Sequence, residues 1–235
     1  MGFFGLDPES QLARSRSEAS SIRVLTLGQS VLLGSLGFGL VSLVVYGMWA
    51  LGGSWMYTNM GEAGFYGLCA LVFVLLTGFI LHRLIIGPGA LGRFFGVFAL
   101  AFTAYAISWC AAWFTLRGKA GEWIGSLAGS IVLGAIVAAA FSAKNAVLRV
   151  ITFLIVTHAA GYFLGEWLYE FCNSPTGDEL LGRVLSNSAR AILSKMTWGA
   201  AYGLGLGAGL GYAFYASQEE VRARLNALRE PARLA

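Results

Sequence analysis

The stretch VLTLGQSVLLGSLGFGLVSLVVYGMWA, residues 24–50, decides the fold class of this chain. It contains no Asp, Glu, Lys, Arg or His, and it is longer than the roughly 20 apolar residues that a helix needs to cross a hydrocarbon core. Its apolar residues run continuously and do not alternate, which favours a membrane helix over a β-barrel strand. Five more stretches share this character. The sequence therefore predicts an all-α, polytopic integral membrane bundle with six spans, at residues 24–50, 63–86, 94–116, 123–142, 146–171 and 191–216.

Composition supports lipid as the solvent. Of 235 residues, 57% are hydrophobic and 12% are charged, about half the charged fraction of a typical soluble domain. So few charges cannot cover a water-facing surface. The basic residues are scattered with no recognition motif beside them, so nucleic acid is not an expected partner. The expected partners are membrane lipids, and a homo-oligomer or a membrane complex is compatible with this composition. The short connections suggest the bacterial inner membrane.

Polar segments flank the predicted bundle. Residues 1–23 are expected to form a cytoplasmic amphipathic segment, with Asp7 as the N-cap of a short helix. Residues 24–216 form the transmembrane domain, and residues 217–235 a cytoplasmic amphipathic helix. Three apolar residues recur at helical spacing among the arginines of that last segment: Val221, Leu225 and Leu228.

The basic residues are divided unequally between the two sides that six spans create. Eleven of the 16 fall on the side that holds both ends of the chain: Arg14, Arg16, Arg23, Arg83, Arg93, Lys144, Arg149, Arg222, Arg224, Arg229 and Arg233. The positive-inside rule therefore predicts that both termini are cytoplasmic. Arg117 and Lys119 form a basic pair on the predicted outer side, which makes the boundaries of the third and fourth spans the weakest part of this topology.

Tryptophan and glutamate mark the predicted outer face. All seven tryptophans fall near the outer ends of spans, where indole rings favour the headgroup level: Trp49, Trp55, Trp109, Trp113, Trp123, Trp167 and Trp198. Glu62, Glu122, Glu166 and Glu170 lie at the same level. The favoured interpretation is that these carboxylates face interfacial water or, for Glu122, a helix N-terminus. The alternative is that they form, with the tryptophans, an acidic, aromatic vestibule that attracts cations.

The fifth predicted span carries a polar stripe. His158, Tyr162, Glu166 and Glu170 recur every four residues, so at 100° per residue each step drifts by only about 40°. An ionisable group inside a membrane is expensive and suggests function. The stripe is predicted to line a path or site for a cation or protonatable solute. The alternatives are a structural role in hydrogen bonds between helices, or a cofactor ligated by His158.

Glycine is abundant, with 32 residues. The sixth predicted span carries Gly199, Gly203, Gly207 and Gly211 at four-residue spacing, with Gly205 and Gly209 on another side. A similar ridge on the fifth span comprises Thr157, Gly161 and Gly165. Small residues at this spacing let helix backbones approach closely in lipid, so tight packing of these two helices is predicted. Space for a ligand or a pore is the alternative.

Enzyme motifs are lacking. The sequence contains no H-E-x-x-H, G-x-S-x-G or P-loop, and its three cysteines form no C-x-x-C pair, so no catalytic residue or metal site is assigned. A G-x-G-x-x-G match at Gly87, Gly89 and Gly92 follows a spanning helix and not a strand, which excludes it as a dinucleotide fingerprint. An enzyme is disfavoured and no cofactor is expected.

The leading functional hypothesis is a small transporter or channel-like protein for an ion or small solute, with the path lined by the polar stripe. The alternative is a non-catalytic, lipid-binding or scaffolding subunit of a membrane complex. A cofactor-binding electron-transfer subunit is a third hypothesis.

Overall fold

The computed structural model describes residues 4–15, 22 and 24–234. Every regular element among these residues is a helix, which confirms the all-α class. Part of the predicted segment 1–23 lies outside the described residues, at positions 1–3, 16–21 and 23. Two short 3₁₀ turns occur at His82–Leu84 and Lys144–Ala146. The α-helices of the described residues are α1 (Pro8–Ser15), α2 (Leu27–Leu81), α3 (Ala90–Leu116), α4 (Gly118–Ala140), α5 (Val147–Asn173), α6 (Pro175–Leu181), α7 (Asn187–Ser217) and α8 (Glu219–Leu234).

Four helices of this described part are long and apolar enough to cross a membrane: α2, α3, α4 and α5. The shortest of them, α4, has 23 residues, more than the roughly 20 that a span needs. Large apolar side chains are exposed on their outer faces, for example Leu32, Leu36, Leu40, Leu71, Leu75 and Phe79. These features suggest an integral membrane protein. Helix α7 has 31 residues but is not among the four.

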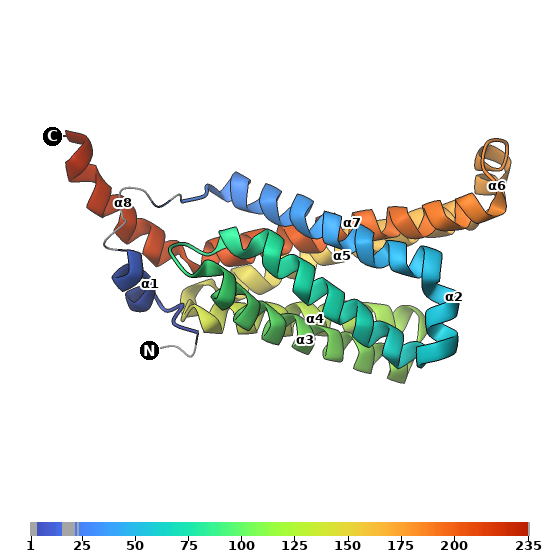
Figure 1. The fold of residues 1–235 in the computed structure, drawn as a ribbon, viewed down its shortest axis with the longest axis horizontal. Coiled ribbons are helices and arrows are strands. Elements are labelled where there is room, and N and C mark those ends of the chain that lie inside the picture. Colours follow the sequence, from blue (N-terminus) through green and yellow to red (C-terminus); the bar gives the residue numbers. More distant parts are fainter. Residues whose placement is uncertain (1–3, 16–21, 23, 235) are drawn as a thin grey trace.

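Helix α2 reverses its direction at Gly61. This residue has φ 69° and ψ 174°, a conformation that glycine adopts without the steric cost of a Cβ atom. Figure 1 shows α2 running to one end of the molecule and returning as a second arm. We call residues 27–60 the first arm and residues 62–81 the second arm. The predicted spans stop at residue 50 and resume at residue 63. The structure instead extends the helix through residues 51–60, which contain neither proline nor charge.

Helix α7 packs between the first arm of α2 and α5, and different glycines serve the two contacts. The ridge of Gly199, Gly203, Gly207 and Gly211 faces α2. A Cβ atom added to Gly203 would lie 2.8 Å from the Cα of Gly39, and one added to Gly207 would lie 2.8 Å from the Cβ of Phe38. Two serines of α2 strengthen this contact, because Ser42 donates a hydrogen bond to the carbonyl of Gly199 and Ser35 to that of Leu204.

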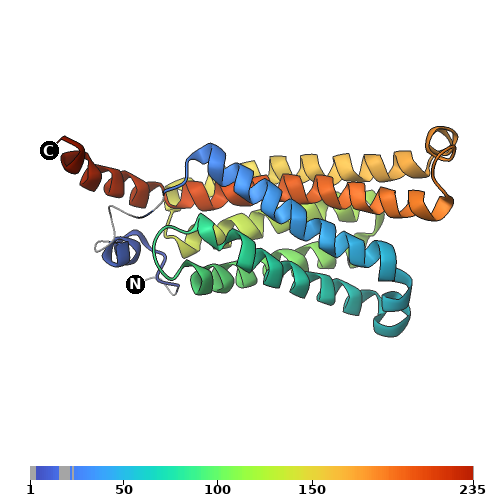
Figure 2. The same cartoon turned by 45° about the horizontal axis from the view of Figure 1, so that its top comes forward.

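The opposite side of α7 faces α5 through Gly205 and Gly209. A Cβ atom added to Gly161 would lie 2.9 Å from the Cα of Gly205, and one added to Gly165 would lie 3.0 Å from the Cα of Trp198. Figures 1 and 2 both show α5 and α7 running side by side. The predicted pairing of these helices is therefore present, but α5 meets Gly205 and Gly209, while the longer ridge is used by α2.

Stacked phenylalanines fill the half of the bundle nearer α1 and α8. Along α3, the ring centroids of Phe94 and Phe98 are 5.3 Å apart, and those of Phe98 and Phe102 are 5.2 Å apart. Phe214 of α7 stacks on Phe94 at 4.9 Å, and Phe38 of α2 lies 6.0 Å from Phe102. All five rings are almost completely buried. This half of the bundle is a packed core.

Helices α1 and α8 lie together at one end of the molecule (Figure 1). Asp7 caps α1 by accepting a hydrogen bond from the backbone N–H of Ser10, as the sequence predicts. Helix α8 contacts α1 through an ion pair between Arg224 and Glu9, 2.6 Å long. A small apolar cluster joins both helices to the bundle: Leu12, Ile86, Val221 and Leu225.

Candidate functional site

The polar stripe predicted on α5 passes through different environments. His158 is completely buried, while Tyr162 and Glu166 expose 5% and 9% of their surface. Glu170, one turn further on, has a side chain that is 61% exposed. The stripe therefore faces the bundle interior for three of its four residues and emerges from it at Glu170.

Hydrogen bonds engage both ring nitrogens of His158. The hydroxyl of Ser130, on α4, lies 3.0 Å from Nδ1, and the hydroxyl of Tyr105, on α3, lies 3.1 Å from Nε2. The Tyr105 hydroxyl also lies 3.2 Å from that of Tyr202 on α7. A neutral imidazole has one donor and one acceptor nitrogen, so this network uses both. The geometry favours a structural role for His158 and does not support ligation of a cofactor.

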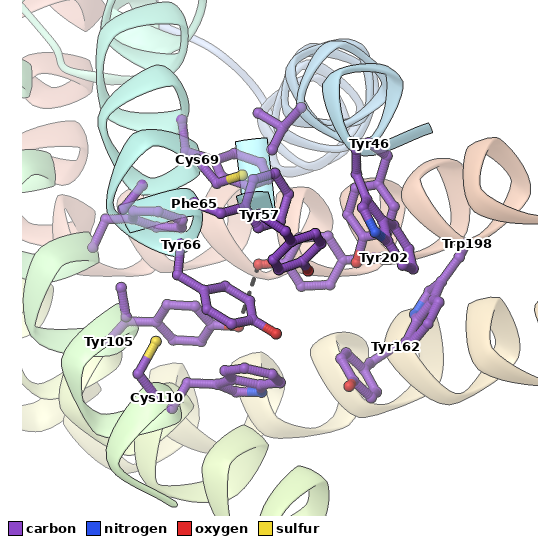
Figure 3. A pocket seen from close by; sticks show the side chains of 17 residues that line it. Tyr46, Tyr57, Phe65, Tyr66, Cys69, Tyr105, Cys110, Tyr162, Trp198 and Tyr202 are labelled. Atoms are coloured by element: carbon purple, nitrogen blue, oxygen red, sulfur yellow. Dashed lines mark hydrogen bonds between the residues drawn. The ribbon is translucent and has the colours of Figure 1, made fainter. Parts of the chain in front are cut away.

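A cavity of about 180 Å³ lies next to this network, between α2, α3, α5 and α7. Figure 3 shows side chains from these helices facing a common space. Of the 17 lining residues, 12 are aromatic: Tyr46, Trp49, Tyr57, Phe65, Tyr66, Phe73, Phe102, Tyr105, Trp109, Tyr162, Trp198 and Tyr202. The other five are Val45, Cys69, Ala70, Ala106 and Cys110. The cavity thus has an aromatic wall that contains no charged residue.

The two ends of the cavity differ. Tyr57, close to the reversal at Gly61, lines the cavity and is itself 36% exposed, so this part of the wall lies at the molecular surface. At the other end, Phe73 stacks on Phe38 with 5.2 Å between ring centroids, and the phenylalanine core begins. The packed phenylalanines thus bound the cavity on the side that is farther from Gly61.

Three glutamates converge on Lys119 near Tyr162. Lys119 forms an ion pair with Glu166 of α5, and its Nζ lies 3.5 Å from Glu170 and 3.8 Å from Glu122. The buried Oε2 of Glu122 accepts no hydrogen bond in the structure. One ammonium thus faces three carboxylates, which leaves this cluster with an excess of negative charge. We call Lys119, Glu122, Glu166 and Glu170 the carboxylate cluster.

The other residue of the basic pair, Arg117, is also neutralised. It lies 3.1 Å from Glu62, which follows Gly61 in α2, and the same carboxylate accepts a hydrogen bond of 3.3 Å from the indole of Trp113. Arg117 and Lys119 thus each contact the glutamates predicted for the outer face. These ion pairs neutralise the two basic residues that the predicted topology assigns to the outer side.

Sequence reasoning missed most of the cavity wall. The wall residues that it identified are Tyr162 of the stripe and three of the outer-face tryptophans, Trp49, Trp109 and Trp198. The tyrosines that it did not identify come from other helices: Tyr46, Tyr66, Tyr105 and Tyr202. A signal for two of them was available. Tyr105 and Tyr202 place a hydroxyl deep in an apolar stretch, where a buried phenol usually has a hydrogen-bonding partner. The structure provides that partner by pairing the two hydroxyls.

The fold and the cavity define an all-α bundle with four candidate membrane-spanning helices and an aromatic site between α2, α3, α5 and α7. Comparison of the chain with models of protein families, with curated proteins and with solved structures finds no match.

Proposed function

We propose that this chain is a small membrane transporter whose solute path follows the stripe face of α5 into the aromatic cavity. The observation that carries the proposal is the cavity itself, which has Tyr57 at the molecular surface and packed phenylalanines on the opposite side. Tyr162 of the stripe lines it, and Glu166 lies one turn closer to the surface. Ligand sites in helical membrane proteins form between helices in this way.

Six crossings with both ends of the chain in the cytoplasm fit this proposal. The two arms of α2 would supply two crossings, and α3, α4, α5 and α7 the other four. The position of α1 and α8 at the same end of the molecule supports an even number (Figure 1). The end of the cavity at Tyr57 would then face outward. The short connections favour the bacterial inner membrane.

The packed phenylalanines favour a transporter over an open channel. A channel needs a continuous path, whereas Phe38, Phe73 and Phe102 close the cavity in this conformation. A solute could leave on the inner side only after the helices move. The glycines of α7 meet backbone atoms of both α2 and α5, and small sliding of packed helices is a known form of such movement, so we assign the movement to α7.

The packed phenylalanines also support a second candidate function, a non-catalytic subunit that binds lipid or scaffolds a membrane complex. A cavity that these rings close on one side suits a ligand that binds and is not released across the membrane. The two functions differ in solute flux, which only the transporter produces.

Liposome flux tests the proposal. Purified protein would be reconstituted and loaded with radiolabelled choline as a small cation or radiolabelled glycerol as a small neutral solute. We expect at least one tracer to cross faster than in protein-free liposomes. We also expect Glu166→Gln to reduce that flux, because the carboxylate lies beside the path.

Glu179→Gln is the matched control. Glu179 lies on α6, is exposed, and forms an ion pair of 3.6 Å with Arg183 on the surface, so its variant should retain wild-type flux. Flux equal to that of protein-free liposomes for both tracers would remove the transport function. Equal flux in wild type and Glu166→Gln would remove the role given to Glu166.

A further inference from the structure

The wall of the cavity attracts positive charge. Nine of its residues are tyrosine or tryptophan, and the faces of these rings carry the negative part of the aromatic quadrupole. A cation within about 6 Å of such a ring is stabilised, and more strongly where water is excluded. No residue that lines the cavity carries a charge, so the rings are the dominant electrostatic feature of the wall.

The protein already places ammonium and guanidinium groups on rings at this end of the bundle. The Nζ of Lys195 lies 4.7 Å from the ring centroid of Trp49, which belongs to the cavity wall. The guanidinium of Arg117 lies 4.9 Å from the ring of Phe114. An aromatic ring of this wall is therefore able to hold an alkylammonium group, here one supplied by the chain itself.

The carboxylate cluster adds a favourable potential beside the cavity. Lys119 neutralises one of its three carboxylates, and Glu122 and Glu166 are 8% and 9% exposed. Water therefore screens these two groups poorly. Glu166 is one turn from Tyr162, a wall residue. The excess negative charge of the cluster offsets part of the hydration free energy that a cation loses on entering the cavity.

The volume limits the size of the ligand. An apolar cavity of about 150 Å³ is known to hold benzene, so 180 Å³ accommodates a group of that size or slightly larger. A nitrogen with three or four methyl or methylene substituents fits this limit. Such a cation is weakly hydrated and needs no oxygen ligands. A metal ion needs several, and the part of the chain that the structure describes groups no three His, Cys, Asp or Glu side chains for one.

We propose that the aromatic cavity binds one small organic cation of the quaternary or N-methylated ammonium type. That the cation is also transported rests on the proposed function, whereas its binding does not. The tyrosine and tryptophan faces surround the cationic nitrogen and its methyl groups, and the carboxylate cluster supplies negative charge next to Tyr162. The ligand enters beside Tyr57, the wall residue that lies at the molecular surface.

Calorimetry with two matched probes tests the charge requirement. Wild-type protein in lipid nanodiscs would be titrated with choline and with 3,3-dimethyl-1-butanol, in which carbon replaces the cationic nitrogen. The two have nearly the same shape, so they differ mainly in charge. We expect choline to bind at least about tenfold more tightly, the ratio that corresponds to about 1.4 kcal/mol of cation–π stabilisation.

Two pairs of variants test whether the ligand binds in the aromatic cavity. Tyr66→Leu removes an aromatic face and should weaken choline binding about tenfold, whereas Tyr66→Phe keeps the face and should bind within about threefold of wild type. Ala106→Phe places a ring in the cavity and should abolish binding. Ala111→Phe adds the same ring at an exposed position of α3 and should bind like wild type. Ala70→Leu fills the cavity from α2 if Ala106→Phe fails to fold.

Equal binding of choline and the neutral alcohol would overturn the proposal. So would wild-type affinity in both Tyr66→Leu and the folded cavity-filling variant. Choline binding that follows these variants, in a protein that gives no flux, would support the ligand class and remove the transport function. The two proposals therefore fail in different measurements.

Discussion

Gly205 of α7 and Gly161 of α5 touch backbone to backbone. A Cβ atom added to Gly205 would lie 2.7 Å from the Cα of Gly161, and one added to Gly161 would lie 2.9 Å from the Cα of Gly205. Even alanine at either position would overlap the facing helix. We expect Gly205→Ala to lower the free energy of unfolding by about 1–3 kcal/mol, the usual cost of overpacking. Thermal unfolding in detergent, followed by circular dichroism, measures this.

Gly67→Ala is the control for that substitution. Gly67 lies in the second arm of α2, and a Cβ atom added to it would meet nothing within 4 Å. Alanine favours the helix over glycine by up to about 1 kcal/mol, so this variant should be as stable as wild type or more stable. If both variants shift stability in the same direction, close packing at Gly205 is not the cause.

Ser42 tests the contact on the other face of α7. Its hydroxyl donates a hydrogen bond of 2.7 Å to the carbonyl of Gly199 and is completely buried. Hydrogen bonds between membrane helices contribute about 0.6 kcal/mol on average and up to about 1.7 kcal/mol. We expect Ser42→Ala to lose an amount in this range. Ser108→Ala should be nearly neutral, because the Ser108 hydroxyl bonds only within its own helix, to Ala104.

The helices were predictable because their signal is local. A run of apolar residues longer than a membrane span identifies a helix without any knowledge of its neighbours. The reversal of α2 was less accessible. Gly52, Gly53, Gly61 and Gly64 all lie in the same region, and composition does not show which one adopts a positive φ. The structure selects Gly61.

The candidate site was predictable only along one helix. His158, Tyr162 and Glu166 share a face of α5 because four-residue spacing brings side chains together on any helix. Their surroundings depend on which helices pack beside them. Tyr105 and Tyr202 lie 97 positions apart in the chain, and Tyr105 contacts both Tyr202 and His158 only because α3, α5 and α7 pack together. The sequence does not show which helices pack beside α5, so it does not distinguish a buried, hydrogen-bonded histidine from a histidine that ligates a cofactor.

A double-mutant cycle tests the network around His158. Tyr105→Phe keeps the ring and removes the hydroxyl that lies 3.1 Å from Nε2, and His158→Leu removes the imidazole. Because the two groups share a buried hydrogen bond, we expect their effects on unfolding free energy to be non-additive by about 0.5–3 kcal/mol. Tyr105→Phe combined with Thr26→Ala should be additive, since Thr26 caps the far end of α2. Additivity in both cycles would contradict the hydrogen bond.

In the carboxylate cluster, a second substitution should restore part of the stability that is lost when Lys119 is replaced. Lys119→Gln removes the ammonium that pairs with Glu166 and faces Glu122, so two poorly exposed carboxylates then repel each other. Lys119 is itself 61% exposed, so we expect a loss of only about 1 kcal/mol, smaller at high salt. Adding Glu122→Gln should restore part of it. Unfolding midpoints at low and high salt measure both effects, and a double variant less stable than Lys119→Gln alone would contradict the repulsion.

Cysteine labelling tests which ends of the bundle face which side. In a background without Cys69, Cys110 and Cys172, single cysteines would replace exposed residues at the two ends of the molecule. Asn59 comes just before the reversal of α2 at Gly61, and Glu179 belongs to α6; Asn145 lies in the turn between α4 and α5, and Leu228 belongs to α8. Figure 1 shows the reversal of α2 and α6 at one end of the molecule, and α1 and α8 at the other. The proposed topology places the first pair outside, so a membrane-impermeant maleimide should label Asn59→Cys and Glu179→Cys in intact cells. Asn145→Cys and Leu228→Cys should react only after the membrane is opened. Labelling of Asn59→Cys and Asn145→Cys under the same conditions would mean that the bundle does not cross the membrane along its long axis.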